Sequence, residues 1–147
     1  MVSVWDLEGL KGLKTPTFFK AGNQDDISGY KKGIKAIYNG NINADRYILT
    51  YANARHNIAA NPPPMESLQA GLHTDEYYRY AEPSWDSRRM NNINQHFVTA
   101  YLGLHLKAKK EYSKYLNLQA NSNDQDWFGF VPRSSTGMEL LHALPKE

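Results

Sequence analysis

The chain has 147 residues, of which 41% are hydrophobic and 12% aromatic, so it can bury a core and form one folded domain. Its formal net charge is only +2 with acids and bases interspersed, which argues against a large basic surface for nucleic acid or anionic lipid. The sequence contains no cysteine, which excludes disulfides, thiolate metal sites and cysteine nucleophiles. No stretch has the uninterrupted apolar length that a membrane-spanning helix needs.

The first predicted strand covers residues 17–21, a short β-branched and aromatic run that Gly22 ends. A polar loop follows it. Asp25 or Asp26 in this loop can cap a helix over residues 27–38, because the apolar residues of that segment recur at helical spacing.

The second predicted strand covers residues 46–51 and is apolar on both faces, as in the centre of a parallel sheet covered by helices. Strand, capped helix and strand form one right-handed crossover unit, which places the two strands parallel to each other. After a loop that reaches residue 60, three successive prolines at 62–64 redirect the chain.

The sequence beyond the prolines predicts mainly helices. The longest runs from Asp86 or Ser87 to Lys109 and carries one apolar stripe, so it is expected to pack against a large surface. The other segments, in chain order, are a short helix over residues 74–80, a broken helix over 110–118, a polar linker over 121–126 and an apolar group over 138–144.

Two polar residues follow the two predicted strands and carry the clearest chemical signal. Asp25 lies in the loop after the first strand, and His56 lies in the loop after the second. The carboxyl ends of neighbouring parallel strands meet at the edge where open α/β sheets keep their active sites. A carboxylate there can accept the histidine Nδ1 proton and leave Nε2 free as a base. The order therefore predicts a catalytic acid–histidine pair.

Two stretches around these residues resemble the acid and histidine loops of the α/β-hydrolase superfamily. They are Pro-Thr-Phe-Phe-Lys-Ala-Gly-Asn-Gln-Asp at residues 16–25 and Leu-Thr-Tyr-Ala-Asn-Ala-Arg-His-Asn at residues 49–57. Together with residues 85–107, they are similar to hydrolases described as predicted dienelactone hydrolases. The resemblance covers the chain from Trp5 to about Lys109.

The resemblance implies a fold and a reaction. The fold would be α/β, with the last strands of a parallel α/β-hydrolase sheet, flanking helices and a helical C-terminal extension. Residues 1–147 would be a single domain, with the crossover unit in 1–60 and a mainly helical extension in 61–147. Asp25 would orient His56, which would act as general base and then general acid on a small-molecule ester or acyl substrate. No metal or organic cofactor is implied.

The nucleophile of such a triad is missing. The sequence has no Gly-x-Ser-x-Gly motif, and residues 133–137 reproduce only its last glycine, so Ser135 is a poor candidate. An acid–histidine pair without a nucleophile or oxyanion donors cannot perform acyl transfer. We therefore expect a C-terminal fragment that is inactive alone and that depends on a missing N-terminal half or self-associates through exposed strand edges.

A structural role for both residues is the alternative. Either of the adjacent acids, Asp25 or Asp26, can serve only as a helix cap. His56 can equally be a packed or surface histidine. The chain would then be a non-catalytic binding or interaction domain.

The remaining charged and metal-ligating residues give weaker signals. His96 and His105 are too far apart on the long predicted helix to share a metal ion, and the pair His73 and Asp75 is too small a ligand set. The lysines between residues 107 and 114 are explained by the preference of a helix C-terminus for positive charge. We expect neither a nucleic-acid partner nor a membrane partner.

Overall fold

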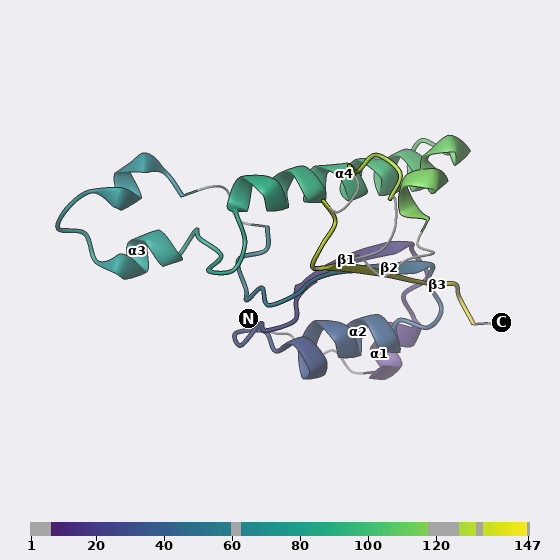
Figure 1. Ribbon diagram of the computed structural model, residues 1–147. Coiled ribbons are helices and arrows are strands. Elements are labelled where there is room, and N and C mark those ends of the chain that lie inside the picture. The colour runs from purple at the N-terminus through teal and green to yellow at the C-terminus, as the bar shows by residue number, and fades with distance from the viewer. Residues whose placement is uncertain (1–6, 60–62, 118–126, 132–133, 147) are drawn as a thin grey trace.

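The computed structural model describes residues 7–59, 63–117, 127–131 and 134–146. In this part of the chain a three-stranded sheet lies between two layers of helices. Figure 1 shows the long helix α4 over one face of the sheet, and the short helices α1 and α2 against the other. These three helices span Ser87–His105, Leu7–Lys11 and Lys35–Gly40.

The sheet is mixed. Its strands, in spatial order, are β1 (Thr17–Gly22), β2 (Arg46–Tyr51) and β3 (Met138–Ala143). β1 and β2 are parallel, with Thr17 opposite Arg46, which confirms the predicted crossover pair. β2 and β3 are antiparallel, with Tyr51 opposite Met138. All six residues of β2 are buried, as expected for its central position.

The expected topology is therefore wrong. A parallel α/β-hydrolase sheet followed by a helical extension was predicted, but the extension contributes β3, an antiparallel strand. The path of the chain explains this direction. α4 begins near the carboxyl end of β2, where Trp85 Nε1 donates to the Ala52 carbonyl oxygen at 2.8 Å. It ends near the amino end of β2, because His105 Nε2 lies 3.8 Å from Asp45 Oδ2.

The chain then returns to the carboxyl end of β2 before β3 begins. There the Ala52 N–H donates to the Gly137 carbonyl oxygen at 2.7 Å. A strand that starts at this end and lies beside β2 can only run antiparallel to it. In β3, Met138 and Leu140 pack into the apolar cluster beneath α4, whereas Leu141 and Ala143 pack on the other face of the sheet. Glu139 and His142 are exposed.

The helix predicted over residues 27–38 begins later than expected. The chain first makes turns, and a π-helical segment at Tyr30–Ile34 then leads into α2. Gly29 has a φ of 73°, outside the helical region, and Gly33 is also non-helical. A Cβ at Gly33 would lie 2.2 Å from the Ser28 carbonyl oxygen, so this close approach requires glycine.

The long helix was predicted with its start correct and its end four residues too late. Asp86 is the N-cap of α4, and its side chain accepts a hydrogen bond from the Arg89 N–H at 2.7 Å. The helix ends at His105, and Ala108 beyond it has a φ of 51°. The remaining helical segments are η2 (Met65–Leu68), α3 (Thr74–Tyr78) and η3 (Lys110–Leu116).

The main hydrophobic core lies between α4 and the sheet. Met90, Ile93 and Phe97 of α4 pack with Leu49 and Tyr51 of β2. Burial of each large apolar side chain stabilises the fold by roughly 1.5–3 kcal/mol. A smaller cluster on the opposite face of the sheet joins α2 to the strands and contains Ala21, Tyr38 and Ile48.

The segment that holds η2 and α3 projects from one end of the molecule (Figure 1). Several of its large apolar side chains are exposed: Met65, Leu68, Leu72 and Tyr78. Among the helices of the described residues, none has the length and apolar character needed to cross a membrane.

Candidate active site

The loops that follow β1 and β2 are joined by hydrogen bonds. The Asn23 N–H donates to the Tyr51 carbonyl oxygen at 3.1 Å, and the Gln24 N–H donates to the Ala54 carbonyl oxygen at 2.9 Å. The Asn53 N–H donates to the side-chain oxygen of Asn23 at 2.7 Å. Each loop thus satisfies backbone groups of the other and holds it in place.

Gly22 allows this close approach. A Cβ at this position would lie 2.1 Å from the Arg55 carbonyl oxygen and 2.4 Å from that of Ala54. Such distances are far inside van der Waals contact, so a larger residue would push the two loops apart. The glycine that precedes Asp25 by three residues in the sequence is therefore a requirement of the loop geometry.

Asp25 and His56 lie together, as the sequence predicts. His56 Nδ1 is 3.1 Å from Oδ2 and 3.2 Å from Oδ1 of Asp25. An ionised carboxylate can only accept hydrogen bonds, so Nδ1 is the donor and Nε2 of the neutral ring carries the free lone pair. The Asp25 side chain is only 10% exposed and that of His56 is 42% exposed. The acid of the pair is therefore nearly buried, whereas the histidine is accessible to solvent.

Asp25 also closes the turn that follows it. Its Oδ1 accepts hydrogen bonds from the backbone N–H groups of Ile27 and Ser28, both at 2.9 Å. Burial raises the pKa of the Asp25 carboxyl, but hydrogen bonds from Ser28, His56 and Ile27 outweigh that effect and hold the pKa below its ordinary value. The carboxyl is therefore ionised at neutral pH and able to accept the His56 proton.

The neighbouring acid has a different partner. Asp26 Oδ1 accepts from Arg55 Nε at 3.2 Å, and its other oxygen forms an ion pair with the same guanidinium group. About half of each side chain is exposed, so solvent screens the pair and it adds little stability. The sequence allowed either Asp25 or Asp26 to be the capping residue. In the structure Asp25 caps the turn and also contacts His56.

His56 lines a pocket of about 450 Å³ between its loop and the segment after α3. Asn57 fixes one wall, because its Nδ2 donates to the carbonyl oxygens of Tyr78 and Ala81 at 2.8 and 3.0 Å. The volume suits a small organic molecule. The lining residues are Asp26, Ile27, Arg55, His56, Asn57, Tyr78, Ala81, Glu82 and Pro83.

Sequence reasoning missed the residues that position the histidine loop. Asn94 of α4 is buried, accepts from the Tyr51 hydroxyl at 2.9 Å and donates to the Ile58 carbonyl oxygen at 2.8 Å. Ser28 was also missed; its Oγ lies 3.5 Å from His56 Nδ1. One signal could have identified Asn94: it lies within the apolar stripe of a predicted helix, and a polar side chain that faces the core needs hydrogen-bond partners there.

Neither Ser135 nor the pair His73 and Asp75 belongs to the His56 pocket. Ser135 is buried and is not among the residues that line the His56 pocket. His73 Nδ1 lies 3.1 Å from Asp75 Oδ2, but both side chains are about three quarters exposed. Within the described residues no group of three or more metal-ligating side chains could hold a metal ion. The predicted linker over residues 121–126 lies outside the described residues.

His105, at the end of α4, contacts the sheet rather than any metal ligand set. Asp45, which precedes β2, lies between it and His142 of β3, whose Nε2 is 2.6 Å from Asp45 Oδ1. The His142 ring also stacks on Tyr47, with 4.0 Å between ring centroids. These contacts tie α4, β2 and β3 together at the end of the molecule opposite to His56.

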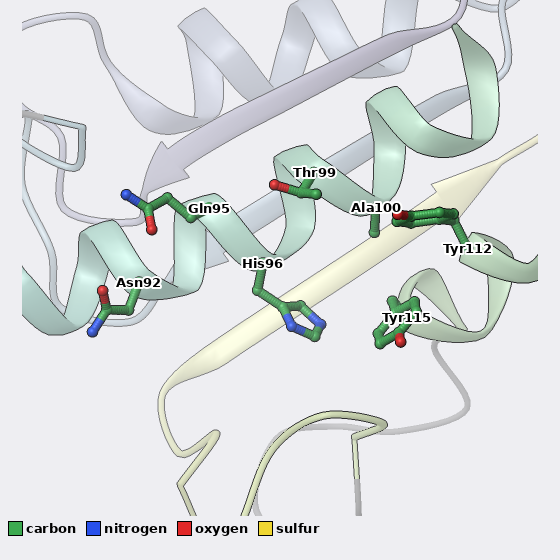
Figure 2. Close-up of a pocket in the computed structure, with 7 residues that line it drawn as sticks. All are labelled: Asn92, Gln95, His96, Thr99, Ala100, Tyr112 and Tyr115. Carbon is green, nitrogen blue, oxygen red and sulfur yellow. The ribbon is translucent and has the colours of Figure 1, made fainter. Parts of the chain in front are cut away.

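A second pocket of about 410 Å³ lies between α4 and η3 and contains His96 (Figure 2). The His96 ring points toward Tyr115 and packs among aromatic rings, with centroids 4.6 Å from Phe130 and 4.9 Å from Phe97. Burial lowers the pKa of His96, although a hydrogen bond to the Tyr115 backbone partly offsets this. No carboxylate is among the residues that line this pocket.

No family model, curated protein or solved structure matches this chain. The likeness of its two loops to α/β-hydrolases is thus still a prediction. What the chain does must be inferred from the geometry of Asp25, His56 and the pocket beside them.

Proposed function

We propose that Asp25 and His56 are the acid–histidine pair of a serine-type hydrolytic site that cleaves an ester or acyl substrate. One observation carries the proposal. The Asp25 carboxylate occupies His56 Nδ1, while the same half-exposed histidine lines a pocket large enough for a small molecule. A carboxylate in this position selects the tautomer whose Nε2 can accept a proton from a reactant.

The proposed roles follow from that tautomer. His56 Nε2 takes the proton of a serine hydroxyl as its oxygen attacks the substrate carbonyl carbon. The same nitrogen then gives the proton to the departing alcohol or amine, and in the second half-reaction it activates water to release the acid. Asp25 accepts from Nδ1 throughout and stabilises the imidazolium that forms between these transfers.

The serine is proposed to come from a polypeptide segment that is not in this sequence. Ser28 contacts His56 at Nδ1, the nitrogen that Asp25 occupies, so it is badly placed to lose a proton to Nε2. Contact with a missing segment or with a second copy of the chain fits the outer edge of β1, which pairs with no strand other than β2 among the described residues. The chain alone is expected to be inactive.

The rival function is a binding or interaction domain in which the pair is structural. A specific observation favours it: Asp25 Oδ1 accepts from the N–H groups of Ile27 and Ser28, so this carboxylate would be useful without any catalysis. The two functions differ in what a reactive serine probe would find.

The test uses the full chain, expressed with an affinity tag in the cells that naturally produce it and purified with any bound polypeptide. Incubation with a fluorophosphonate, which labels activated serines, should modify a serine in the preparation. His56→Gln should abolish the labelling, because the substitution removes the base but keeps a polar side chain of similar length. A preparation that is never labelled, or whose labelling survives His56→Gln, contradicts the proposal.

A further inference from the structure

The pocket beside His56 contains a buried carboxylate that the proposed catalysis does not use. Glu82 lines this pocket and is only 5% exposed. Its Oε1 accepts a long hydrogen bond from the Ser84 N–H at 3.5 Å. Its Oε2 is fully covered and has no hydrogen-bond partner among the described residues. A buried carboxylate normally accepts several hydrogen bonds, so Glu82 lacks most of the partners that would offset the cost of its burial.

The nearest cation does not fill this gap. Arg55 lines the same pocket and lies close enough for Glu82 to raise its pKa, but its main partner is Asp26, whose hydrogen bond and charge act more strongly. Arg55 and Asp26 form an ion pair with each other, whereas the Glu82 carboxylate has no ion pair among the described residues that line the pocket. A positively charged ligand group is the complement of that charge.

The rest of the lining is apolar or aromatic. Ile27 and Tyr78 are both more than half exposed, so their apolar surfaces are accessible to a ligand in the pocket. Ala81 and Pro83 extend the same apolar wall. These residues suit the hydrocarbon body of a ligand, and the Tyr78 ring offers a face for a cation.

We propose that this pocket binds an organic ammonium compound, with the ammonium group at the Glu82 carboxylate and an apolar body against Ile27 and Tyr78. This inference rests on the proposed hydrolytic function. Together with that function, it specifies the substrate as an ester or acyl compound that carries an ammonium group. Binding itself requires neither a serine nor turnover, so it is measured independently of hydrolysis.

The experiment titrates the purified full chain with three probes of nearly equal shape and different charge: benzylammonium, benzyl alcohol and benzoate. Backbone amide signals of Asn57, Tyr78 and Ala81 are followed by NMR. Benzylammonium should bind at least about tenfold more tightly than benzyl alcohol, since hydrogen bonds to charged groups are the stronger ones. Benzoate should bind most weakly. Equal binding of the ammonium and the alcohol, or no binding of either, overturns the proposal.

Glu82→Gln is the matching variant, because glutamine keeps the acceptor for the Ser84 N–H and removes only the charge. It should erase the preference for benzylammonium. Glu66→Gln, at an exposed position of η2, is the control and should preserve it. A preference that survives Glu82→Gln also refutes the assignment; if that variant does not fold, the three-probe series on the unsubstituted chain still decides.

The outcomes separate the two proposals. If benzylammonium binds through Glu82 but no serine is ever labelled by the fluorophosphonate, the ammonium site stands and the hydrolytic function falls. If labelling depends on His56 but the three probes bind equally, the hydrolytic function stands and the substrate class is wrong.

Discussion

His56 and His96 line pockets of similar volume, about 450 and 410 Å³, yet their surroundings differ in kind. His56 has a carboxylate on Nδ1 and a side chain that is 42% exposed. His96 is surrounded by aromatic rings, and Figure 2 shows amide and hydroxyl side chains of α4 along the same pocket. A histidine becomes a useful base when one nitrogen is oriented and the other is accessible, and only His56 meets both conditions among these two.

The comparison also shows how loops and helices place a histidine differently. His56 lies in a loop held by hydrogen bonds from Asn57 and Asn94, which leave its ring uncovered. His96 lies half-buried on α4, where packing against Phe97 and Phe130 holds its ring. Loops on a rigid scaffold commonly carry reactive groups, whereas helix faces supply packing.

The largest expected effect separates the two adjacent acids. In the fluorophosphonate assay, Asp25→Asn should slow labelling by up to about 10⁴-fold, the scale of the corresponding substitution in serine proteases, because asparagine can donate to Nδ1 and favours the wrong tautomer. Asp26→Asn, which removes only the ion pair with Arg55, should leave the rate nearly unchanged. The reverse order of effects would mean that Asp26 is the working acid; no effect of either would refute the pairing.

The next effect concerns the loop contact that creates the His56 site. Gly22→Ala places a Cβ against the carbonyl oxygens of Ala54 and Arg55 and should lower the free energy of unfolding by about 1–3 kcal/mol or more. Chemical denaturation followed by circular dichroism measures the change. Gly9→Ala in α1, where a Cβ meets nothing within 4 Å, is the control and should be neutral or stabilising by up to about 1 kcal/mol. Equal effects of the two substitutions would show that the loops tolerate separation.

A smaller effect should distinguish His96 by its pH dependence. Burial lowers the pKa of His96, so the unfolded chain binds a proton more readily than the folded one. Its contribution to stability is therefore complete above the unfolded value of about 6.5 and is lost as the pH falls through the folded pKa. His96→Phe should remove this part of the pH profile of the unfolding free energy. A profile that is unchanged by the substitution would contradict the packing role.

The smallest expected pH effect belongs to Asp25. Its folded pKa lies below the ordinary value of 3.8, so its contribution to stability is present above that value and is lost as the pH falls through the folded pKa. Asp25→Asn should reduce the pH dependence of the unfolding free energy only at the acid end of the profile. The dependence near pH 6 should remain, because it arises from His96. Acid denaturation curves of Asp25→Asn and His96→Phe test whether the two residues act in different pH ranges. Changes in the same pH range for both variants would contradict this prediction.

Local sequence patterns predicted the elements that position the site. The residue types and length of the two strands are local signals, and the parallel pairing of β1 and β2 confirms the crossover unit that they predicted. The glycine before Asp25 and the loop that carries His56 are local signals too. The start of α4 at Asp86 was likewise readable, because an aspartate before an apolar helix stripe is a typical cap.

The features that the sequence did not predict, β3 and the wall of the pocket, depend on contacts between segments that are far apart in the chain. Residues 138–143 form a strand because the chain returns to the carboxyl end of β2, and nothing in their own short apolar run specifies an antiparallel partner. The wall that Glu82 contributes to the pocket is equally non-local, since it is fixed by hydrogen bonds from Asn57 to the segment around Ala81. Local patterns therefore located the acid and the histidine but could not describe the pocket they share.

The acid–histidine pair requires that one particular nitrogen of His56, Nδ1, carries the proton in the neutral ring. Long-range ¹⁵N–¹H NMR spectra of the full chain, recorded above the pH at which histidines are protonated, report this tautomer for each ring. The geometry predicts the proton on Nδ1 of His56, donated to Asp25, and a shift toward the other tautomer in Asp25→Asn. A neutral His56 that carries its proton on Nε2 in the unsubstituted chain would contradict the acid–histidine pair.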